Sequence, residues 1–92
     1  MPGYELISVV AASLQTNMET LLDFSRKGWI QTATRNTHMY LAADQRYRAK
    51  YILYLHGARH LSDDQIQLVL SAQRPPYAAS QVDEILKQHA VG

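Results

Sequence analysis

The first third of the chain carries two amphipathic stretches in succession. In the first, apolar residues follow the i, i+3, i+4, i+7 spacing of one helix face: Ile7, Val10, Ala11 and Leu14. A second apolar stripe follows: Met18, Leu21, Leu22 and Phe24. Thr16 or Asn17 can cap this second helix, and Gly28 can end it. Two short helices joined by a tight turn are a candidate helix-turn-helix.

Two runs of β-branched and aromatic residues come next, over residues 29–34 and 37–41. With Arg35-Asn36 between them, they predict a small hairpin that must pack on the helices to be stable. Residues 42–58 then predict a longer helix, with three tyrosines on one side: Tyr47, Tyr51 and Tyr54. We expect these tyrosines to pack in the core, as aromatic stripes at helical spacing usually do. The alternative is that they and Tyr40 stack on the bases of single-stranded nucleic acid.

The last third of the chain predicts two more helices separated by a break. Ser62 and Gln65 form a capping box ahead of an apolar face: Ile66, Val69 and Leu70. Pro75-Pro76 ends that helix, because proline cannot continue it. A short helix then opens at Ser80, and its apolar stripe needs a surface to cover it, on the domain or on a second copy.

The predicted fold class is therefore mainly α. It is a winged helix-turn-helix with a small two-stranded wing and additional C-terminal helices. We expect the winged-helix domain to span residues 1–74, and the Pro-Pro break with the short C-terminal helix to span residues 75–92.

Composition narrows the class of protein. A chain of 92 residues fits one domain, and 47% hydrophobic with 18% charged residues is typical of a globular one. Cysteine is absent, which excludes disulfides, thiolate catalysis and cysteine-ligated metals. No apolar run approaches the ~20 residues of a membrane-spanning helix, and the first residues lack the basic-then-apolar order of a signal peptide. We expect a cytoplasmic protein with no membrane partner.

The net charge of +1 hides an uneven distribution. Residues 24–60 carry seven lysines and arginines against one acidic residue, whereas the segments on either side are mildly acidic. Concentrated positive charge attracts phosphate by releasing the counterions bound to it. The charge pattern therefore favours a nucleic acid as partner, although the solvated face of any basic helix has the same pattern.

Residues 7–30 resemble the N-terminal half of the winged-helix DNA-binding domain of the MerR family. The matching positions are Ile7, Ala11, Leu21, the run Arg26-Lys27-Gly28-Trp29 and, further along, Tyr40, Asp44, Ile52, Leu55, Leu61-Ser62 and Ile66, so that the resemblance covers about residues 7–70. It implies a winged-helix fold and DNA binding in a bacterial or phage protein. Stand-alone relatives of this kind include excisionases.

At several positions the chain departs from that family's pattern. The family usually presents arginine and an arginine-tyrosine-tyrosine run on the second helix, where this chain has Glu19 and Leu22-Asp23-Phe24. Asn36-Thr37-His38 replaces the family's glycine-tyrosine-arginine on the wing, and Gln15 replaces the turn glycine. A branch of the same superfamily, the CbpM type, also has an acidic second helix and binds a co-chaperone J-domain.

Two functions follow from these observations. The first is a small DNA-binding transcriptional regulator or DNA-architectural factor, in which Asn17 and Thr20 reach base edges of double-stranded DNA. The residues expected to hold phosphates are Arg26, Lys27, Arg35, Arg46, Arg48 and Lys50. The alternative is a protein-binding adaptor whose Glu19 and Asp23 contact a basic partner. A stripe that can bind a partner in either case, including a second copy in a homodimer, consists of Val82, Ile85 and Leu86.

Enzymatic and metal chemistry are not expected. His56 and His60 have the spacing of a zinc-binding pair, but Gly57 between them is expected to end the helix, and zinc needs at least three well-placed ligands. The chain has no glycine-rich phosphate loop, no nucleophile elbow and no pair of carboxylates among apolar residues. We therefore expect no catalytic residue, no metal site and no cofactor.

Overall fold

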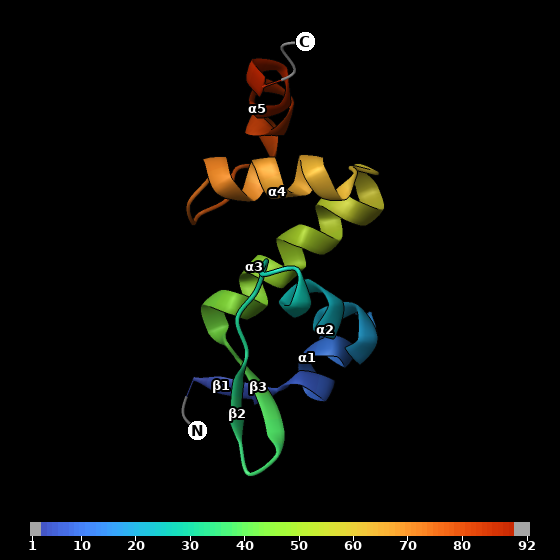
Figure 1. The fold of residues 1–92 in the computed structure, drawn as a ribbon, viewed down its shortest axis with the longest axis vertical. Coiled ribbons are helices and arrows are strands. Elements are labelled where there is room, and N and C mark those ends of the chain that lie inside the picture. Colours follow the sequence, from blue (N-terminus) through green and yellow to red (C-terminus); the bar gives the residue numbers. More distant parts are fainter. Residues whose placement is uncertain (1–2, 90–92) are drawn as a thin grey trace. The chain divides into compact units, whose positions relative to one another are not determined.

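A computed structural model describes residues 3–89 (Figure 1). Within this range the chain is mainly helical, with five α-helices and one three-stranded antiparallel sheet. It divides into two compact units, Met1–Lys50 and Tyr51–Gly92. The boundary between the units falls inside the helix α3 (Ala43–Leu53), whereas the sequence placed a domain boundary after Arg74.

The N-terminal unit contains the predicted helix pair, α1 (Ile7–Ser13) and α2 (Met18–Arg26). Of the two cap candidates, Thr16 and Asn17, it is Asn17 that caps α2. The apolar stripes supply the core of this unit, which continues through the segment after α2 and into the sheet and α3. Its buried residues are Ile7, Val10, Ala11, Leu21, Phe24, Trp29, Ile30, Leu41 and Ala49. The spacing of apolar residues therefore predicted these two helices correctly.

Both helices of the pair end in the same type of C-terminal turn. After α2, Gly28 has φ +76°, the amide of Trp29 donates to the carbonyl of Phe24 (3.0 Å), and the rings of these two residues are 5.7 Å apart. These are the bonds and the apolar contact of a Schellman motif. After α1, Gln15 has φ 58° and takes the position that glycine usually occupies. The turn between the two helices therefore holds a non-glycine residue in the left-handed backbone conformation, which is unfavourable for a residue with a side chain.

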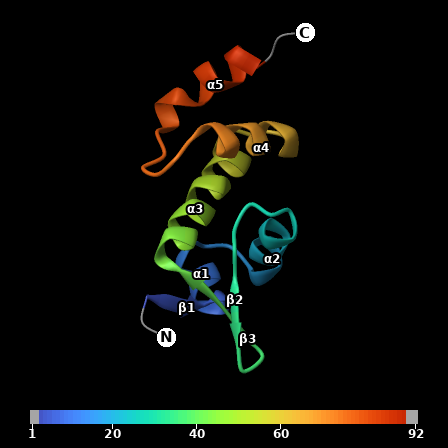
Figure 2. The same cartoon turned by 60° about the vertical axis from the view of Figure 1, so that its left-hand side comes forward.

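The sheet has one strand more than the sequence predicted. β2 (Ala33–Arg35) and β3 (His38–Ala42) form the expected hairpin, whose turn projects beyond the rest of the unit (Figures 1 and 2). β1 (Tyr4–Leu6) pairs with the other edge of β3, so that the strand order is β1-β3-β2. The predicted two-stranded hairpin is therefore present, but it is part of a larger sheet, which the three residues directly before α1 complete.

The hairpin itself differs from the prediction in its register. Arg35 pairs with His38, so the two-residue turn is Asn36-Thr37 and not Arg35-Asn36. Both turn residues have positive φ, 52° and 66°, as a type I′ turn requires. The first strand is short, because the buried residues Trp29 and Ile30 lie outside the sheet and pack in the core.

The C-terminal unit is built from helices. After α3 the chain continues into a π-helical turn, Tyr54–Ala58, so the single helix expected over residues 42–58 is interrupted. α4 (Asp63–Ala72) begins with the predicted capping box, in which Ser62 and Gln65 bond reciprocally. The 3₁₀ turn Ala79–Gln81 leads into α5 (Val82–His89).

The last helix packs on its own chain. α5 contacts α4, and Val82 and Ile85 are 0% and 8% exposed while Leu86 is half-buried. This confirms that the apolar stripe needed a surface and that the domain supplies one. It corrects the expectation that the stripe can bind a partner, because Val82 and Ile85 are already covered.

The tyrosine stripe is only partly in the core. Tyr51 is 8% exposed, whereas Tyr47 and Tyr54 are 45% and 36% exposed, so the prediction of core packing was wrong for two of the three. Tyr51 stacks on Tyr77 with ring centroids 4.8 Å apart. Its hydroxyl donates to Oε1 of the buried Gln73 (2.5 Å), whose amide donates to the carbonyl of Ala78 (2.9 Å). These bonds hold the chain after α4 in place.

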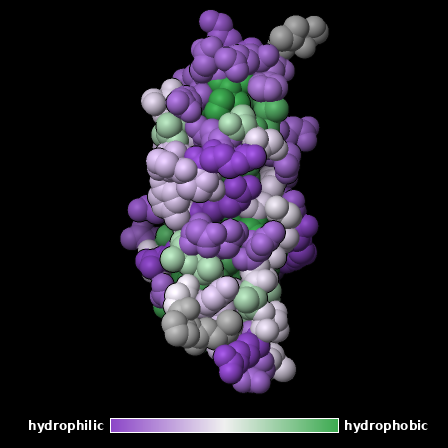
Figure 3. Space-filling model, turned by 90° about the vertical axis from the view of Figure 1, so that its left-hand side faces the viewer, coloured by the Kyte–Doolittle hydropathy of each residue, from purple (hydrophilic) through white to green (hydrophobic). Residues whose placement is uncertain are grey.

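In the part of the chain that the structure describes, the helices are too short or too polar to cross a membrane. On the face drawn in Figure 3, hydrophilic side chains cover most of the surface, and the hydrophobic areas are small and separated.

Candidate nucleic-acid interface

Asn17 and Thr20, the residues expected to read base edges, form the N-terminal cap of α2. Oδ1 of Asn17 accepts hydrogen bonds from the backbone amide of Thr20 (2.8 Å) and from its hydroxyl (3.0 Å). This bond to the amide satisfies a donor that would otherwise have no partner at the helix N-terminus. The contact that the structure shows for Asn17 and Thr20 is therefore with each other, and their predicted role in reading base edges stays a prediction.

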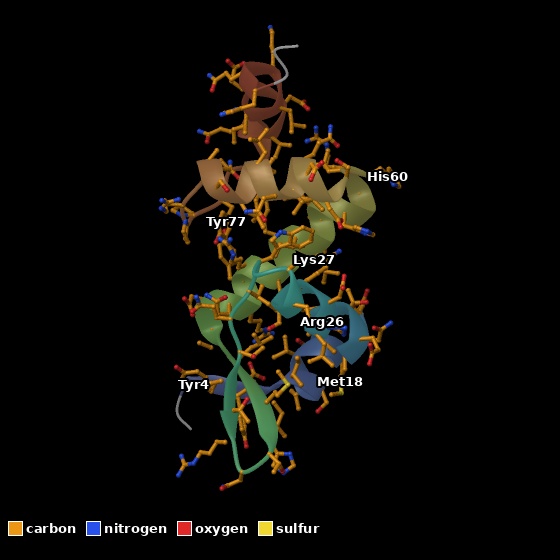
Figure 4. All side chains as sticks on the ribbon, viewed as in Figure 1. Tyr4, Met18, Arg26, Lys27, His60 and Tyr77 are labelled. Atoms are coloured by element: carbon orange, nitrogen blue, oxygen red, sulfur yellow. The ribbon has the colours of Figure 1, made fainter. Side chains whose placement is uncertain are left out.

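The exposed face of α2 brings together the acidic and the basic residues that the sequence assigned to competing functions. Glu19 and Arg26 approach to 3.6 Å, with side chains 83% and 62% exposed. Asp23 and Lys27 form a closer pair, 2.9 Å apart and one helical turn from each other. Arg26 and Lys27 lie at the same end of α2 (Figure 4). Each acid therefore has a base as its partner.

Lys27 is held more firmly than Arg26. Its Nζ lies 4.8 Å from the centroid of the Trp29 ring, a cation–π contact, while it also bonds Asp23. The hydrogen bond from Lys27 lowers the pKa of Asp23 below its ordinary value of 3.8, against a smaller opposing effect of desolvation. The Asp23 carboxylate is thus charged throughout the neutral and mildly acidic range. With two acids and two bases paired, the exposed face of α2 has no net charge.

The environment of Arg35, next to the hairpin turn, differs from that of Arg26 and Lys27. Arg35 and His38 face each other across the last pair of the hairpin, and both are exposed. No carboxylate among the described residues forms an ion pair with Arg35. The sequence predicted Arg35 as a phosphate contact, and this geometry leaves its guanidinium available for one.

The three basic residues of α3 have three different environments. Arg46 pairs with Glu5 of β1 (2.9 Å) and so links the first strand to the helix. Arg48 is half-buried, and its Nε donates to the carbonyl of Trp29, which fixes the segment after α2. Lys50 is exposed and has no ion pair within residues 3–89. Of the three residues expected to contact phosphate from this helix, only Lys50 has no ion-pair or hydrogen-bond partner among residues 3–89.

A second exposed surface of this unit was not foreseen. It is the outer face of the sheet, and its residues include Tyr4 and Leu6 of β1, which are 41% and 37% exposed. The alternation Tyr4-Glu5-Leu6 is too short to identify a strand from the sequence, so the pattern does not predict that these residues share an exposed face.

Within the described part of the chain, the histidine pair does not belong to a group of side chains that could hold a metal ion. His56 and His60 are exposed, His60 with φ 54°, and residues 3–89 contain no group of three His, Cys, Asp or Glu side chains placed to hold a metal ion. In the C-terminal unit, Arg59 instead bonds Tyr54 and Asp83, and these two groups raise the pKa of Arg59.

Comparison of the chain with protein-family models, with curated proteins and with solved structures gives no match.

Proposed function

We propose that this protein is a small DNA-binding regulator or architectural protein whose N-terminal unit acts as a winged helix of the MerR type. The observation that carries the proposal is the position of Arg35, an exposed cation without an ion pair among residues 3–89. It is the last residue before the turn of a hairpin that pairs with β1 next to the helix pair. A projecting hairpin beside two short helices is the arrangement that such domains use to contact duplex DNA at two places. The N-terminal unit has six basic and four acidic side chains, which adds a general attraction to phosphate.

In this proposal the contacts with DNA are mainly to phosphates. Arg35 on the hairpin and Lys50 on α3 are the cations that need not give up an intramolecular partner. Arg26 and Lys27 contact phosphate only by exchanging Glu19 and Asp23 for it. Because phosphate contacts carry no sequence information, we expect modest affinity and low sequence specificity for the isolated chain.

Fluorescence anisotropy with a labelled duplex of random sequence at low salt tests the proposal. We expect measurable affinity, and we expect Arg35→Ala and Lys50→Ala each to reduce the slope of log affinity against log salt by about 0.9. Lys87→Ala is the matched control, since it removes one exposed cation from α5 in the other unit. If the wild type has no affinity for the duplex at low salt, the DNA-binding function is refuted. The protein-binding adaptor is then the remaining function.

A further inference from the structure

The register of the sheet defines which side chains share its outer face. Residues directly paired across two antiparallel strands point to the same side, and neighbours along a strand alternate. Leu41 is 1% exposed, so its face is the inner one. Its neighbours Tyr40 and Ala42, with their partners Leu6 and Tyr4, therefore lie on the outer face. The same rule places Ala33 there, and also the pair Arg35 and His38.

This outer face combines aromatic rings with positive charge. Tyr4 is exposed and Tyr40 is half-buried, and neither has a hydrogen bond or ring contact from its side chain within the described residues. Arg35 and His38 follow Tyr40 on the same face, and alternate residues of a strand are about 7 Å apart. Going along β3, the face changes from cationic at the hairpin turn to aromatic at the far end.

A small polar pocket adjoins the aromatic end. It has a volume of about 200 Å³, and Tyr4 contributes to its wall together with Gln31, Asp44 and Gln45. Oε1 of Gln45 accepts from the backbone amide of Gln31 (2.8 Å), and Nε2 of Gln45 donates to Asp44 (3.3 Å). Asp44 has no ion pair in the described part of the chain, so its carboxylate can accept from a ligand.

We propose that the outer face of the three-stranded sheet binds single-stranded nucleic acid, with unpaired bases stacked on Tyr4 and Tyr40 and the phosphates directed to Arg35 and His38. Base stacking on exposed aromatic rings beside a basic groove is the general mode of single-strand binding. Asp44 and the amides of the pocket then bond the edges of a base, where amino and imino groups are donors. A duplex cannot occupy this face in the same way, because its bases are stacked on one another.

This inference does not rest on the proposed duplex binding, and one set of variants separates the two. The probes are short labelled oligo-dT and oligo-U strands, measured by anisotropy. We expect Tyr4→Ala to lower the affinity for at least one strand by about 5- to 150-fold, the range measured for single stacked bases, and Tyr4→Phe to keep most of it. Tyr47→Ala removes an equally exposed tyrosine, 45% against 41%, from α3 of the same unit and should have no such effect. Duplex affinity should respond to Arg35→Ala and not to Tyr4→Ala.

A competition experiment distinguishes stacking from simple attraction between charges. An abasic strand of the same length has the same phosphates without bases, and we expect it to compete much less well than oligo-dT. The proposal is overturned if the abasic strand competes equally, if Tyr4→Ala leaves both single-strand affinities unchanged, or if Tyr47→Ala lowers them as much. It is also overturned if Tyr4→Ala changes the sedimentation of the free protein, since the face is then a contact between copies.

Discussion

Removing the two carboxylates of α2 should convert a neutral helix face into a DNA-binding one. In the double variant Glu19→Gln, Asp23→Asn the side chains keep their shape but no longer hold Arg26 and Lys27 as ion pairs. Arg26 and Lys27 then no longer have a carboxylate as ion-pair partner, while Lys27 keeps its contact with the Trp29 ring, and two charges that repel phosphate are lost. We therefore expect the variant to bind duplex DNA more tightly than the wild type.

The magnitude follows from the number of available cations. In the wild type, Arg35 and Lys50 give a slope of log affinity against log salt of about −1.8. Adding Arg26 and Lys27 doubles the slope to about −3.6. Between 50 and 200 mM salt the wild type should thus lose about tenfold in affinity and the variant about 150-fold, a difference that titrations resolve readily.

The assay is a salt series of duplex titrations by fluorescence anisotropy. Its control is Asp64→Asn, Glu84→Gln, which changes the net charge of the protein by the same amount with carboxylates from α4 and α5. If the ion pairs on α2 keep Arg26 and Lys27 from binding phosphate, only the first variant steepens the slope of log affinity against log salt. Equal slopes for the two variants would mean that net charge alone governs binding. An unchanged slope in the first variant would show that α2 does not face DNA.

Two predictions concern stability and are measured by urea denaturation followed by circular dichroism. Gly28→Ala should destabilise the protein by about 1 kcal/mol or more, because φ is +76° there. No atom beyond the two neighbouring residues lies within 4 Å of the added Cβ, so the effect comes from the backbone conformation alone. Gln15→Gly should stabilise it for the same reason, with φ 58°, and Gly57→Ala, which lacks a positive φ and also has open space, is the control that should not destabilise. Val82→Ala should lower the free energy of unfolding by about 1.5–3 kcal/mol, since Val82 is fully buried. Val9→Ala is the control: Val9 is 47% exposed, and its replacement should change the free energy of unfolding by less than about 0.5 kcal/mol. Equal effects at the two valines would contradict the packing of α5.

Features that depend on neighbouring residues can be predicted from the amino-acid sequence alone. A cap at Thr16 or Asn17, the end of α2 at Gly28 and the capping box at Ser62 were all predicted, and the structure has the cap at Asn17 and both of the other features. In each of them a side chain or a glycine acts on backbone groups only a few residues away. The apolar stripes of α1, α2, α4 and α5 were read in the same way, from residues within two turns of each other.

Features that join distant residues depend on how the chain folds and could not be predicted from local patterns. β1 has three residues and no recognisable pattern, and it is a strand because β3, more than thirty residues later, offers it an edge. The engagement of Arg48 with Trp29 and of Arg46 with Glu5 likewise depends on how α3 lies against the rest of its unit. A list of charges states how many cations a chain has, but which of them can still bind phosphate depends on which carboxylates and carbonyls folding places beside them.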